Sequence, residues 1–310
     1  MTFSVVVGAG GTGRAVARLL ADSGERVKLV TRSGSGPEHP GIERIAGDAT
    51  AVDWLTSLSA GATTLYNCAM PSYDRWPTDW PPLAAALLTV AERSGADYVM
   101  LGNVYAYGPV TGLVVEDQPS APTTVKGAVR AQMWADALAA HEAGRVRVTE
   151  VRGSDFLGAD TMSVYNLLVV PAVLAGVATS YPADLDVEHS WTYVDDAART
   201  MIAAARHDDA WGRAWHVPSV SALPVRALSA ELAALASAPE PQVTELTLVE
   251  LARLGTQDPI TAELLEMQYL VRAPFLLDST HSEAVLGVTA TPLKAVLTET
   301  IDAHQHVTAR

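Results

Sequence analysis

Ser4-Val5-Val6-Val7-Gly8-Ala9-Gly10-Gly11-Thr12-Gly13-Arg14-Ala15 is the stretch that decides the fold of this chain. The β-branched run before Gly8 is typical of a buried strand, and apolar residues at helical spacing follow Gly13. Gly8, Gly10 and Gly13 keep the Gly-x-Gly-x-x-Gly spacing, which brings the diphosphate of a dinucleotide onto an open helix N-terminus. The alternative is an ordinary strand-to-helix turn without a ligand, and the strand and helix on either side favour the dinucleotide site.

Short apolar strands alternate with amphipathic helices through the first half of the chain, which predicts a parallel sheet covered by helices. We expect an α/β fold, namely a Rossmann-type doubly wound parallel sheet with a smaller, mostly helical C-terminal substrate lobe. Residues 1–155 would form the dinucleotide-binding core, and residues 156–310 the lobe, interleaved with the last strands of the sheet. The expected strands are Val5–Val7, Val27–Val30, Thr63–Asn67, Tyr98–Leu101 and Val146–Val151, and the expected helices include Leu83–Arg93, Val125–Ala143, Val164–Gly176, Asp195–Ala205, Leu248–Leu254 and Ala262–Leu270.

The formal net charge of the 310 residues is −14, which argues against nucleic acid or an anionic membrane surface as a partner. Cys68 is the only cysteine, so an internal disulfide and a cysteine-based zinc site are excluded. We expect no metal, because no clustered histidines or further carboxylates accompany Asp195 and Asp196. No apolar run approaches the roughly 18 residues of a membrane span, and Met1 is followed almost at once by a strand, so a cytoplasmic protein without a signal peptide is expected. A monomer and a homodimer are both compatible with the sequence.

Further motifs follow the glycine loop in a definite order and spacing. They are Gly47-Asp48-Ala49, Asn67-Cys68-Ala69, Asn103-Val104-Tyr105-Ala106-Tyr107-Gly108, then Glu116, Pro119 and Lys126, then Arg152-Gly153-Ser154-Asp155 with Gly158, and Tyr193-Val194-Asp195-Asp196-Ala197. With these motifs the chain resembles the short-chain dehydrogenase/reductase superfamily. The resemblance is to its extended and atypical branches, which include nucleotide-sugar epimerases, dehydratases and NmrA-like proteins.

The resemblance implies catalytic residues, and the chain departs from them at one position. Reductases of the superfamily use a Ser, a Tyr and a Lys, with the Tyr four residues before the Lys. Here Pro122 stands at the Tyr position, Lys126 remains, and Asn103 stands at the Ser position. Lys126 is implied to bond the nicotinamide ribose. Tyr105 matches the catalytic acid of the sugar dehydratases, so we expect it to donate a proton, with a packing role in the pocket wall as the alternative.

The residue that closes the second strand selects the cofactor, because an acidic side chain there would repel a 2′-phosphate. That residue is Thr31, and Arg32 and Ser33 follow it. A neutral residue followed by arginine suits a phosphorylated ribose, and Arg14 adds a second cation. We therefore expect NADP, with NAD as the alternative. The expected cofactor-binding residues are Gly8, Gly10, Gly11, Thr12, Gly13, Arg14, Thr31, Arg32, Ser33, Asp48, Ala49, Cys68, Ala69 and Lys126.

The loop 70–80 is rich in aromatic residues in a chain with only 3 phenylalanines, and it follows a strand of the predicted sheet. Aromatic faces at the carboxyl edge of the sheet suit a flat, apolar substrate. The alternative is that Trp76 and Trp80 only pack on the following helix. The expected substrate-contacting residues are Met70, Tyr73, Trp76, Tyr105, Tyr165, His189 and Trp191. His189 falls where nucleotide-sugar enzymes tend to hold an arginine, which argues against a nucleotide-sugar substrate.

These observations predict an NAD(P)-dependent oxidoreductase that lacks the usual tyrosine of the superfamily. We expect its substrate to be an apolar, aromatic or quinone metabolite of polyketide type. Its reaction would support an oxygenation step in secondary metabolism. Two alternatives stay open: an epimerase or dehydratase that acts on a small or sugar substrate, and a non-catalytic NmrA-like dinucleotide sensor.

Overall fold

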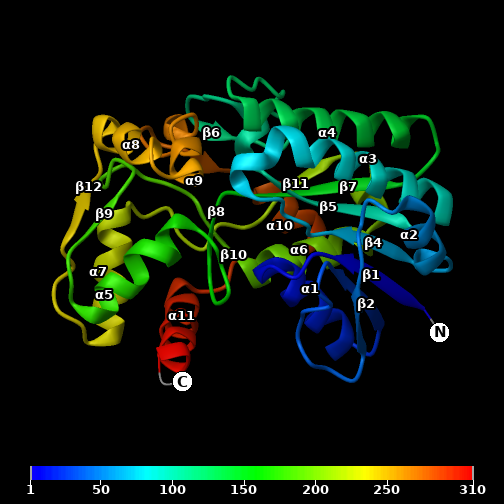
Figure 1. The fold of residues 1–310 in the computed structure, drawn as a ribbon, viewed down its shortest axis with the longest axis horizontal. Helices are drawn as coiled ribbons and strands as arrows, with labels where there is room; N and C mark the ends of the chain where they lie inside the picture. The colour runs from blue at the N-terminus through cyan, green and yellow to red at the C-terminus, as the bar shows by residue number, and fades with distance from the viewer. Residues whose placement is uncertain (1, 309–310) are drawn as a thin grey trace.

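The computed structural model describes residues 2–308, arranged around a seven-stranded parallel sheet with strand order β11-β7-β5-β4-β1-β2-β3 (Figure 1). The strands are β1 (Phe3–Val7), β2 (Arg26–Thr31), β3 (Ile42–Ala46), β4 (Thr64–Asn67), β5 (Asp97–Asn103), β7 (Val148–Gly153) and β11 (Ala214–His216). Val5, Val6 and Val7 are buried, as expected for a parallel strand covered on both faces. The strand order reverses between β1 and β4, and ligands of such sheets bind at the carboxyl ends of the strands at this reversal.

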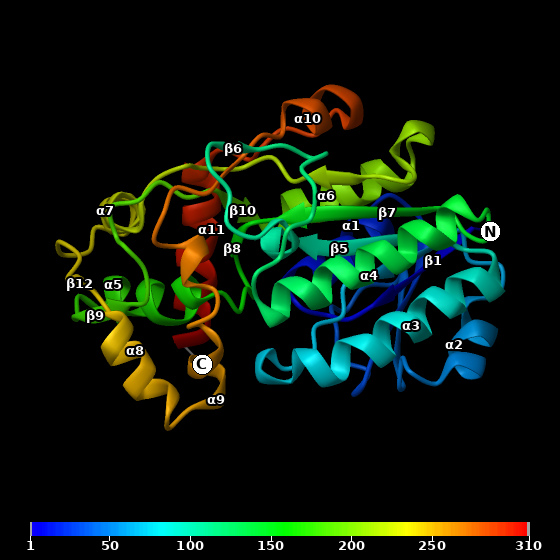
Figure 2. The ribbon, with the colours of Figure 1, turned by 90° about the horizontal axis from the view of Figure 1, so that it is seen from above.

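Helices cover both faces of the sheet, which confirms the predicted doubly wound fold. One face carries α1 (Gly11–Asp22) packed against α6 (Val194–Ala205). The other carries α2 (Val52–Ser59), α3 (Trp76–Ser94) and α4 (Val125–Glu142), which contact one another in sequence (Figures 1 and 2). Each face therefore buries its own apolar core against the sheet.

A smaller lobe lies beyond the carboxyl ends of the strands (Figure 2). Its elements are β8 (Asp155–Leu157), a π-helical turn (Tyr165–Val169), α5 (Val170–Ala175), β9 (Thr179–Tyr181), β10 (Trp191–Tyr193), α7 (Val225–Ala236), β12 (Val243–Glu245), α8 (Leu248–Gly255), α9 (Pro259–Glu263) and α11 (Leu293–Thr308). The short β6 (Leu113–Val114) pairs with β13 (Leu276–Leu277), and α10 (Thr280–Leu286) follows. Between lobe elements the chain returns to the sheet as α6 and β11, so the lobe is interleaved with it. A domain division at residue 155 stays a prediction.

Several elements differ from the sequence-based expectation. Helix α3 begins at Trp76 rather than Leu83, and it contains Pro81 and Pro82. Each proline removes one helical hydrogen bond, and the burial of Trp76 and Trp80 holds this turn in place. The predicted helix 262–270 is split into α9 and a 3₁₀ turn at Gln268–Leu270. Helix α11 was not predicted as a distinct element.

Candidate active site

The glycine loop joins β1 to α1, and each of its motif glycines meets a different steric demand. Gly8 has φ +100°, and a Cβ there would lie 2.4 Å from the Cys68 carbonyl oxygen. A Cβ on Gly13 would lie 2.1 Å from the Gly8 carbonyl oxygen, so helix and strand pack too closely for a side chain. Gly10 has no atom within 4 Å of its Cβ position, and as the N-cap of α1 it makes no side-chain cap. The loop thus leaves an open helix N-terminus with room for a diphosphate, which fits a dinucleotide.

Gly11 and Arg14, at the start of α1, lie close to Asp160 in the segment after β8. A Cβ on Gly11 would lie 3.4 Å from the Asp160 carbonyl oxygen, so the segment after β8 passes close to the loop. The Arg14 guanidinium donates to the Ala9 carbonyl oxygen at 3.1 Å and lies 3.7 Å from the Asp160 carboxylate. Thr12 is buried in the first turn of α1. Arg14 is therefore engaged within the loop in this conformation.

At the end of β2 the structure shows a neutral residue followed by an exposed cation. The Thr31 hydroxyl donates to the Ser35 carbonyl oxygen at 3.1 Å, while Arg32 and Ser33 are exposed. The pKa of the Asp79 carboxyl lies below its ordinary value, chiefly because of its hydrogen bond from Arg75, and the charge of Arg32 adds a smaller contribution. Arg32 is therefore close enough to the first turn of α3 for its charge to act on Asp79.

The remaining expected cofactor residues lie along the same edge. Asp48 accepts hydrogen bonds from the backbone N–H of Thr50 at 2.9 Å and from its hydroxyl at 2.7 Å, and these bonds lower the pKa of the Asp48 carboxyl. Ala49 is half-buried beside it. Cys68 is buried behind Gly8, and burial raises the pKa of its thiol to about 12. The Ala69 backbone N–H donates to the Asn67 side chain at 3.2 Å. These assignments stay predictions.

Lys126 lies in the first turn of α4 with its side chain 0% exposed. Its ammonium forms ion pairs with Glu263 and, at 3.0 Å, with Glu266, both from the C-terminal lobe. The same ammonium lies 4.6 Å from the centroid of the Tyr73 ring, within the range of a cation–π contact. Pro122 packs near this helix end, 3.0 Å from the Cβ position of Gly127. The lysine is therefore surrounded by carboxylates and an aromatic face.

Two phenols meet beside Lys126. The hydroxyl oxygens of Tyr73 and Tyr105 are 3.3 Å apart, and both side chains are half-buried. Burial, with a contribution from the charge of Asp155, raises the pKa of Tyr105 to about 12. The backbone N–H of Tyr105 donates to the side chain of Asn103 at 3.1 Å, which fixes the turn that carries the phenol. Tyr105 therefore stays protonated at neutral pH and can act as a proton donor.

Several expected substrate residues lie in the core. Trp76 is buried, and the guanidinium of Arg130 lies 4.7 Å from its ring and 4.5 Å from the ring of Trp80, so both indoles help to pack α3 on α4. Tyr165 and Trp191 are buried together in the lobe, with ring centroids 5.2 Å apart. Tyr73 and Tyr105 are the half-buried aromatic residues of the expected set.

The two remaining expected substrate residues are in contrasting environments. Met70 is 58% exposed on the loop after β4. His189 is buried and lies 2.9 Å from the Asp155 carboxylate, with the Ser154 hydroxyl 3.5 Å from the same ring nitrogen. An acidic partner at His189 makes this position unlike the arginine that would pair with a phosphate.

Sequence reasoning missed Glu263 and Glu266, which lie about one helical turn apart in the chain. Both approach Lys126 from more than 130 residues away in the sequence. Their spacing gives a weak signal, because exposed acidic residues three apart are common on helices. Only the three-dimensional arrangement relates them to the site.

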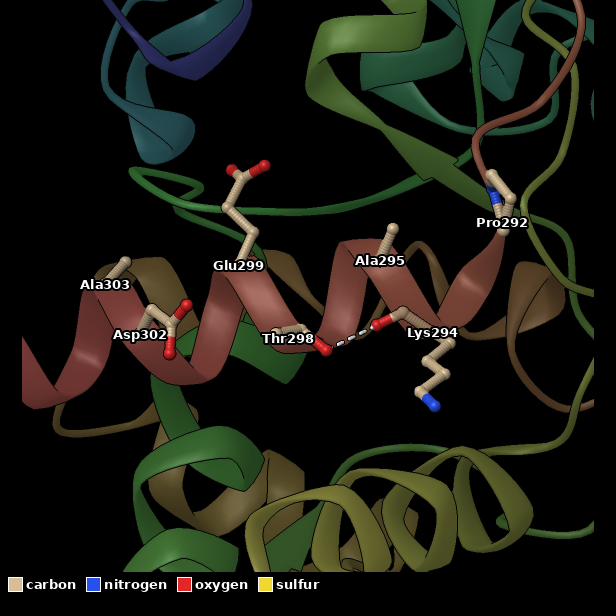
Figure 3. Close-up of a pocket in the computed structure, with 7 residues that line it drawn as sticks. All are labelled: Pro292, Lys294, Ala295, Thr298, Glu299, Asp302 and Ala303. Carbon is tan, nitrogen blue, oxygen red and sulfur yellow. Dashed lines mark hydrogen bonds between the residues drawn. The ribbon is translucent and has the colours of Figure 1, made fainter.

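Residues 2–308 contain neither a candidate membrane span nor a candidate metal site. In this part of the chain no helix is both long and apolar enough to cross a membrane, and no group of three or more His, Cys, Asp or Glu is placed to hold a metal ion. A groove of about 700 Å³ runs along α11, lined by Pro292, Lys294, Ala295, Thr298, Glu299, Asp302 and Ala303 (Figure 3). None of these residues belongs to the expected site.

The sheet order, the glycine loop and the lysine at the start of α4 define an extended short-chain dehydrogenase/reductase fold. A sequence model of the NAD dependent epimerase/dehydratase family matches residues 4–217, and the chain belongs to this family. A stretch of 126 residues is 34% identical to a shikimate dehydrogenase (NADP(+)) of Haloarcula marismortui. This match covers 40% of the chain and only 43% of that relative.

Solved structures share the whole fold. MoeE5 in complex with UDP-glucose and NAD superimposes with a TM-score of 0.78 at 20% identity, over 99% of both chains. UDP-glucuronic acid 4-epimerase from Bacillus cereus in complex with NAD superimposes with a TM-score of 0.81 at 15% identity, over 99% of this chain and 97% of that one. At such identities the likeness shows the fold alone.

Proposed function

We propose that the chain is an NAD(P)H-dependent reductase of a flat, apolar carbonyl compound, with quinones of aromatic polyketide type as the substrate class. The observation that carries the proposal is the contact between two phenols beside Lys126, since the hydroxyl oxygens of Tyr73 and Tyr105 are 3.3 Å apart. No tyrosine stands four residues before Lys126, and the phenol that replaces it, Tyr105, has a raised pKa of about 12 and stays protonated. Such a site can give a proton to an oxygen atom but holds no tyrosinate to remove one.

The roles of the residues follow from this arrangement. NAD(P)H, when bound, supplies the hydride. The loop Gly8–Gly13 would hold the diphosphate on the N-terminus of α1, and Lys126 would bind the nicotinamide ribose, as the family resemblance implies. The Tyr105 hydroxyl would donate its proton to the substrate oxygen, and the hydride and this proton together complete a two-electron reduction. The Tyr73 hydroxyl, 3.3 Å away, would return a proton to Tyr105.

This site suits the reduction of a quinone better than the reduction of a simple ketone. Reduction of a ketone builds charge on a strongly basic alkoxide, which needs a well-placed acid. The anion of a hydroquinone is delocalised and much less basic, so a hydrogen bond from Tyr105 is sufficient to stabilise it. The rings of Tyr73 and Tyr105 provide apolar surface for a flat substrate. The hydroquinone product can react with oxygen, which would connect the reaction to an oxygenation step.

NADPH is the cofactor that we propose, with NADH as the alternative. Arg32 is exposed after the neutral Thr31, where it can pair with a 2′-phosphate. The partial relative from Haloarcula marismortui is named for NADP(+), which agrees with this choice. The two similar structures named above contain NAD, which supports the alternative.

An epimerase or dehydratase that acts on a nucleotide sugar is the second candidate. It is favoured by the family and by the likeness to MoeE5, whose structure contains UDP-glucose. Such a reaction starts by oxidising a hydroxyl group, which requires a base, and the neutral Tyr105 does not supply one. His189 stands where nucleotide-sugar enzymes tend to hold an arginine, and its ring contacts the Asp155 carboxylate, so this position offers no guanidinium to a diphosphate.

One assay separates the candidates. The purified protein is mixed anaerobically with NADPH or NADH and a polycyclic quinone, and absorbance at the nicotinamide band is followed by stopped flow. We expect NADPH to be consumed, and oxygen to be taken up when air is admitted. Turnover of UDP-glucose or of a simple ketone without quinone reduction would support the second candidate. Tight dinucleotide binding without any turnover would identify a sensor.

A further inference from the structure

The segment that follows α8 reaches across from the lobe and covers the start of α4. One Glu266 carboxylate oxygen accepts from the Val125 backbone N–H at 2.8 Å. The other accepts from the Lys126 backbone N–H at 3.3 Å and from its ammonium at 3.0 Å. Glu263 adds a second carboxylate to the same ammonium. The lobe therefore contributes both a cap for helix α4 and the charge partners of Lys126.

The two carboxylates and the Tyr73 ring together surround the Lys126 ammonium. An ammonium has three N–H donors. Two of them face Glu263 and Glu266, and the Tyr73 ring lies 4.6 Å away on a further side. Because the lysine is 0% exposed, no donor faces solvent. A nicotinamide ribose bound by Lys126 would therefore compete with these carboxylates for the same N–H donors.

The part of the lobe that carries these carboxylates is loosely packed. Leu251 is the only buried side chain of α8, and α9 has none. Directly after it the chain is anchored again, since Met267, Leu270 and Phe275 are buried in one apolar cluster. A segment with few buried contacts opens at a small cost in free energy. Residues 248–266 can therefore move while the segment that follows keeps its place.

We propose that Glu263 and Glu266 form a latch that competes with the nicotinamide ribose of the cofactor for Lys126. In the latched form α9 closes the catalytic end of the site and leaves the glycine loop open. Cofactor binding displaces the carboxylates from the ammonium, and residues 248–266 move away with them. The latch rests on the proposed function, because that function assigns the ribose to Lys126.

The test measures dinucleotide binding rather than turnover. Glu263→Gln and Glu266→Gln, alone and combined, are titrated with NADPH and with NADH by calorimetry. Glutamine keeps the size of each side chain, and at position 266 its carbonyl can still accept from the start of α4. If the latched form dominates, its loss raises the competent fraction, and the double variant should bind about 10-fold or more tightly. Glu245→Gln, which removes a carboxylate that pairs with Arg272 in the same lobe, should leave the Kd unchanged.

The outcomes separate the latch from the function on which it rests. Tighter binding by Glu263→Gln, which leaves the cap of α4 intact, supports the latch even if Glu266→Gln folds poorly. Binding by the variants at the wild-type Kd, or more weakly, would overturn the latch and leave the reductase proposal standing. Failure of the wild type and every folded variant to bind either dinucleotide would overturn both.

Discussion

The two ends of the proposed cofactor site are built in different ways. At the phosphate end, Gly8, Gly10 and Gly13 shape the backbone of one continuous stretch, and no side chain is needed to hold a diphosphate. At the catalytic end, Tyr73, Tyr105 and Lys126 come from separate segments, and their partners come from the other lobe. Binding by backbone is therefore a local property of the chain, while the chemistry depends on contacts between distant segments. Pro122, at the position where the superfamily pattern has a tyrosine, belongs to this second end.

Tyr105→Phe tests the catalytic end and should give the largest effect. Removal of a positioned proton donor lowers turnover by about 100- to 10,000-fold. Binding of cofactor and substrate should change little, because the ring remains. Tyr73→Phe is the matched control and should lower turnover less, since it acts through Tyr105. Steady-state kcat and KM with a quinone substrate give the comparison, and equal turnover by wild type and Tyr105→Phe would remove the phenol from the mechanism.

A pair of glycine substitutions tests the phosphate end. Gly13→Ala should destabilise the fold by about 3 kcal/mol, because its Cβ would lie 2.1 Å from a backbone oxygen. Gly10→Ala meets no atom within 4 Å, so its Tm should match that of the wild type while its dinucleotide affinity falls. Thermal unfolding and calorimetry with NADPH measure the two effects. A Gly10→Ala variant with unchanged affinity would show that the diphosphate does not approach this loop.

The contribution of His216 to the free energy of unfolding should depend on pH. His216 accepts a hydrogen bond at 2.7 Å from Tyr107, in the same short helix as Tyr105, and donates one to the Asp278 carbonyl oxygen at 2.7 Å. Burial lowers the pKa of His216 from 6.5 to about 4. Between pH 6.5 and 4 the unfolded chain binds a proton that the folded chain does not, so stability falls as pH falls, by about 3 kcal/mol.

Denaturant unfolding of the wild type and His216→Gln between pH 7 and 4 tests this contribution. The variant should be less stable at pH 7, because it loses hydrogen bonds, but its stability should fall less steeply with acid. Parallel pH profiles for the two proteins would show that His216 does not contribute to the acid sensitivity.

Arg32→Ala should give the smallest effect, limited to one cofactor. Loss of a charged hydrogen bond to the 2′-phosphate weakens NADPH binding by about 2 kcal/mol. NADH binding should stay nearly the same, because NADH lacks that phosphate. Calorimetry with both cofactors decides the point, and equal losses would rule out recognition of a 2′-phosphate by this arginine.

Five of the seven strands of the sheet could be located from the sequence because their information is local, whereas no range was given for β3 or β11. Each expected strand, such as Val27–Val30, overlaps an observed one. The glycine spacing could be interpreted from the sequence because a side chain at Gly8 or Gly13 would clash with the backbone. Helix α3 was predicted too short because proline usually ends a helix, and the burial of Trp76 outweighs that preference here. The pairing of Glu263 with Lys126 could not be predicted, since an acidic residue in a short helix gives no sign of what it contacts.

Because the chain has a single cysteine, the proposed movement of residues 248–266 can be followed with a label at one introduced thiol. Cys68 is buried and, with a thiol pKa of about 12, stays unreactive toward maleimides at neutral pH. Val249 on α8 is 80% exposed, so Val249→Cys would introduce the one thiol in the chain that reacts readily. A fluorophore attached there reports on α8 without any need to remove a native cysteine. Site-specific spectroscopy of this protein therefore requires one substitution.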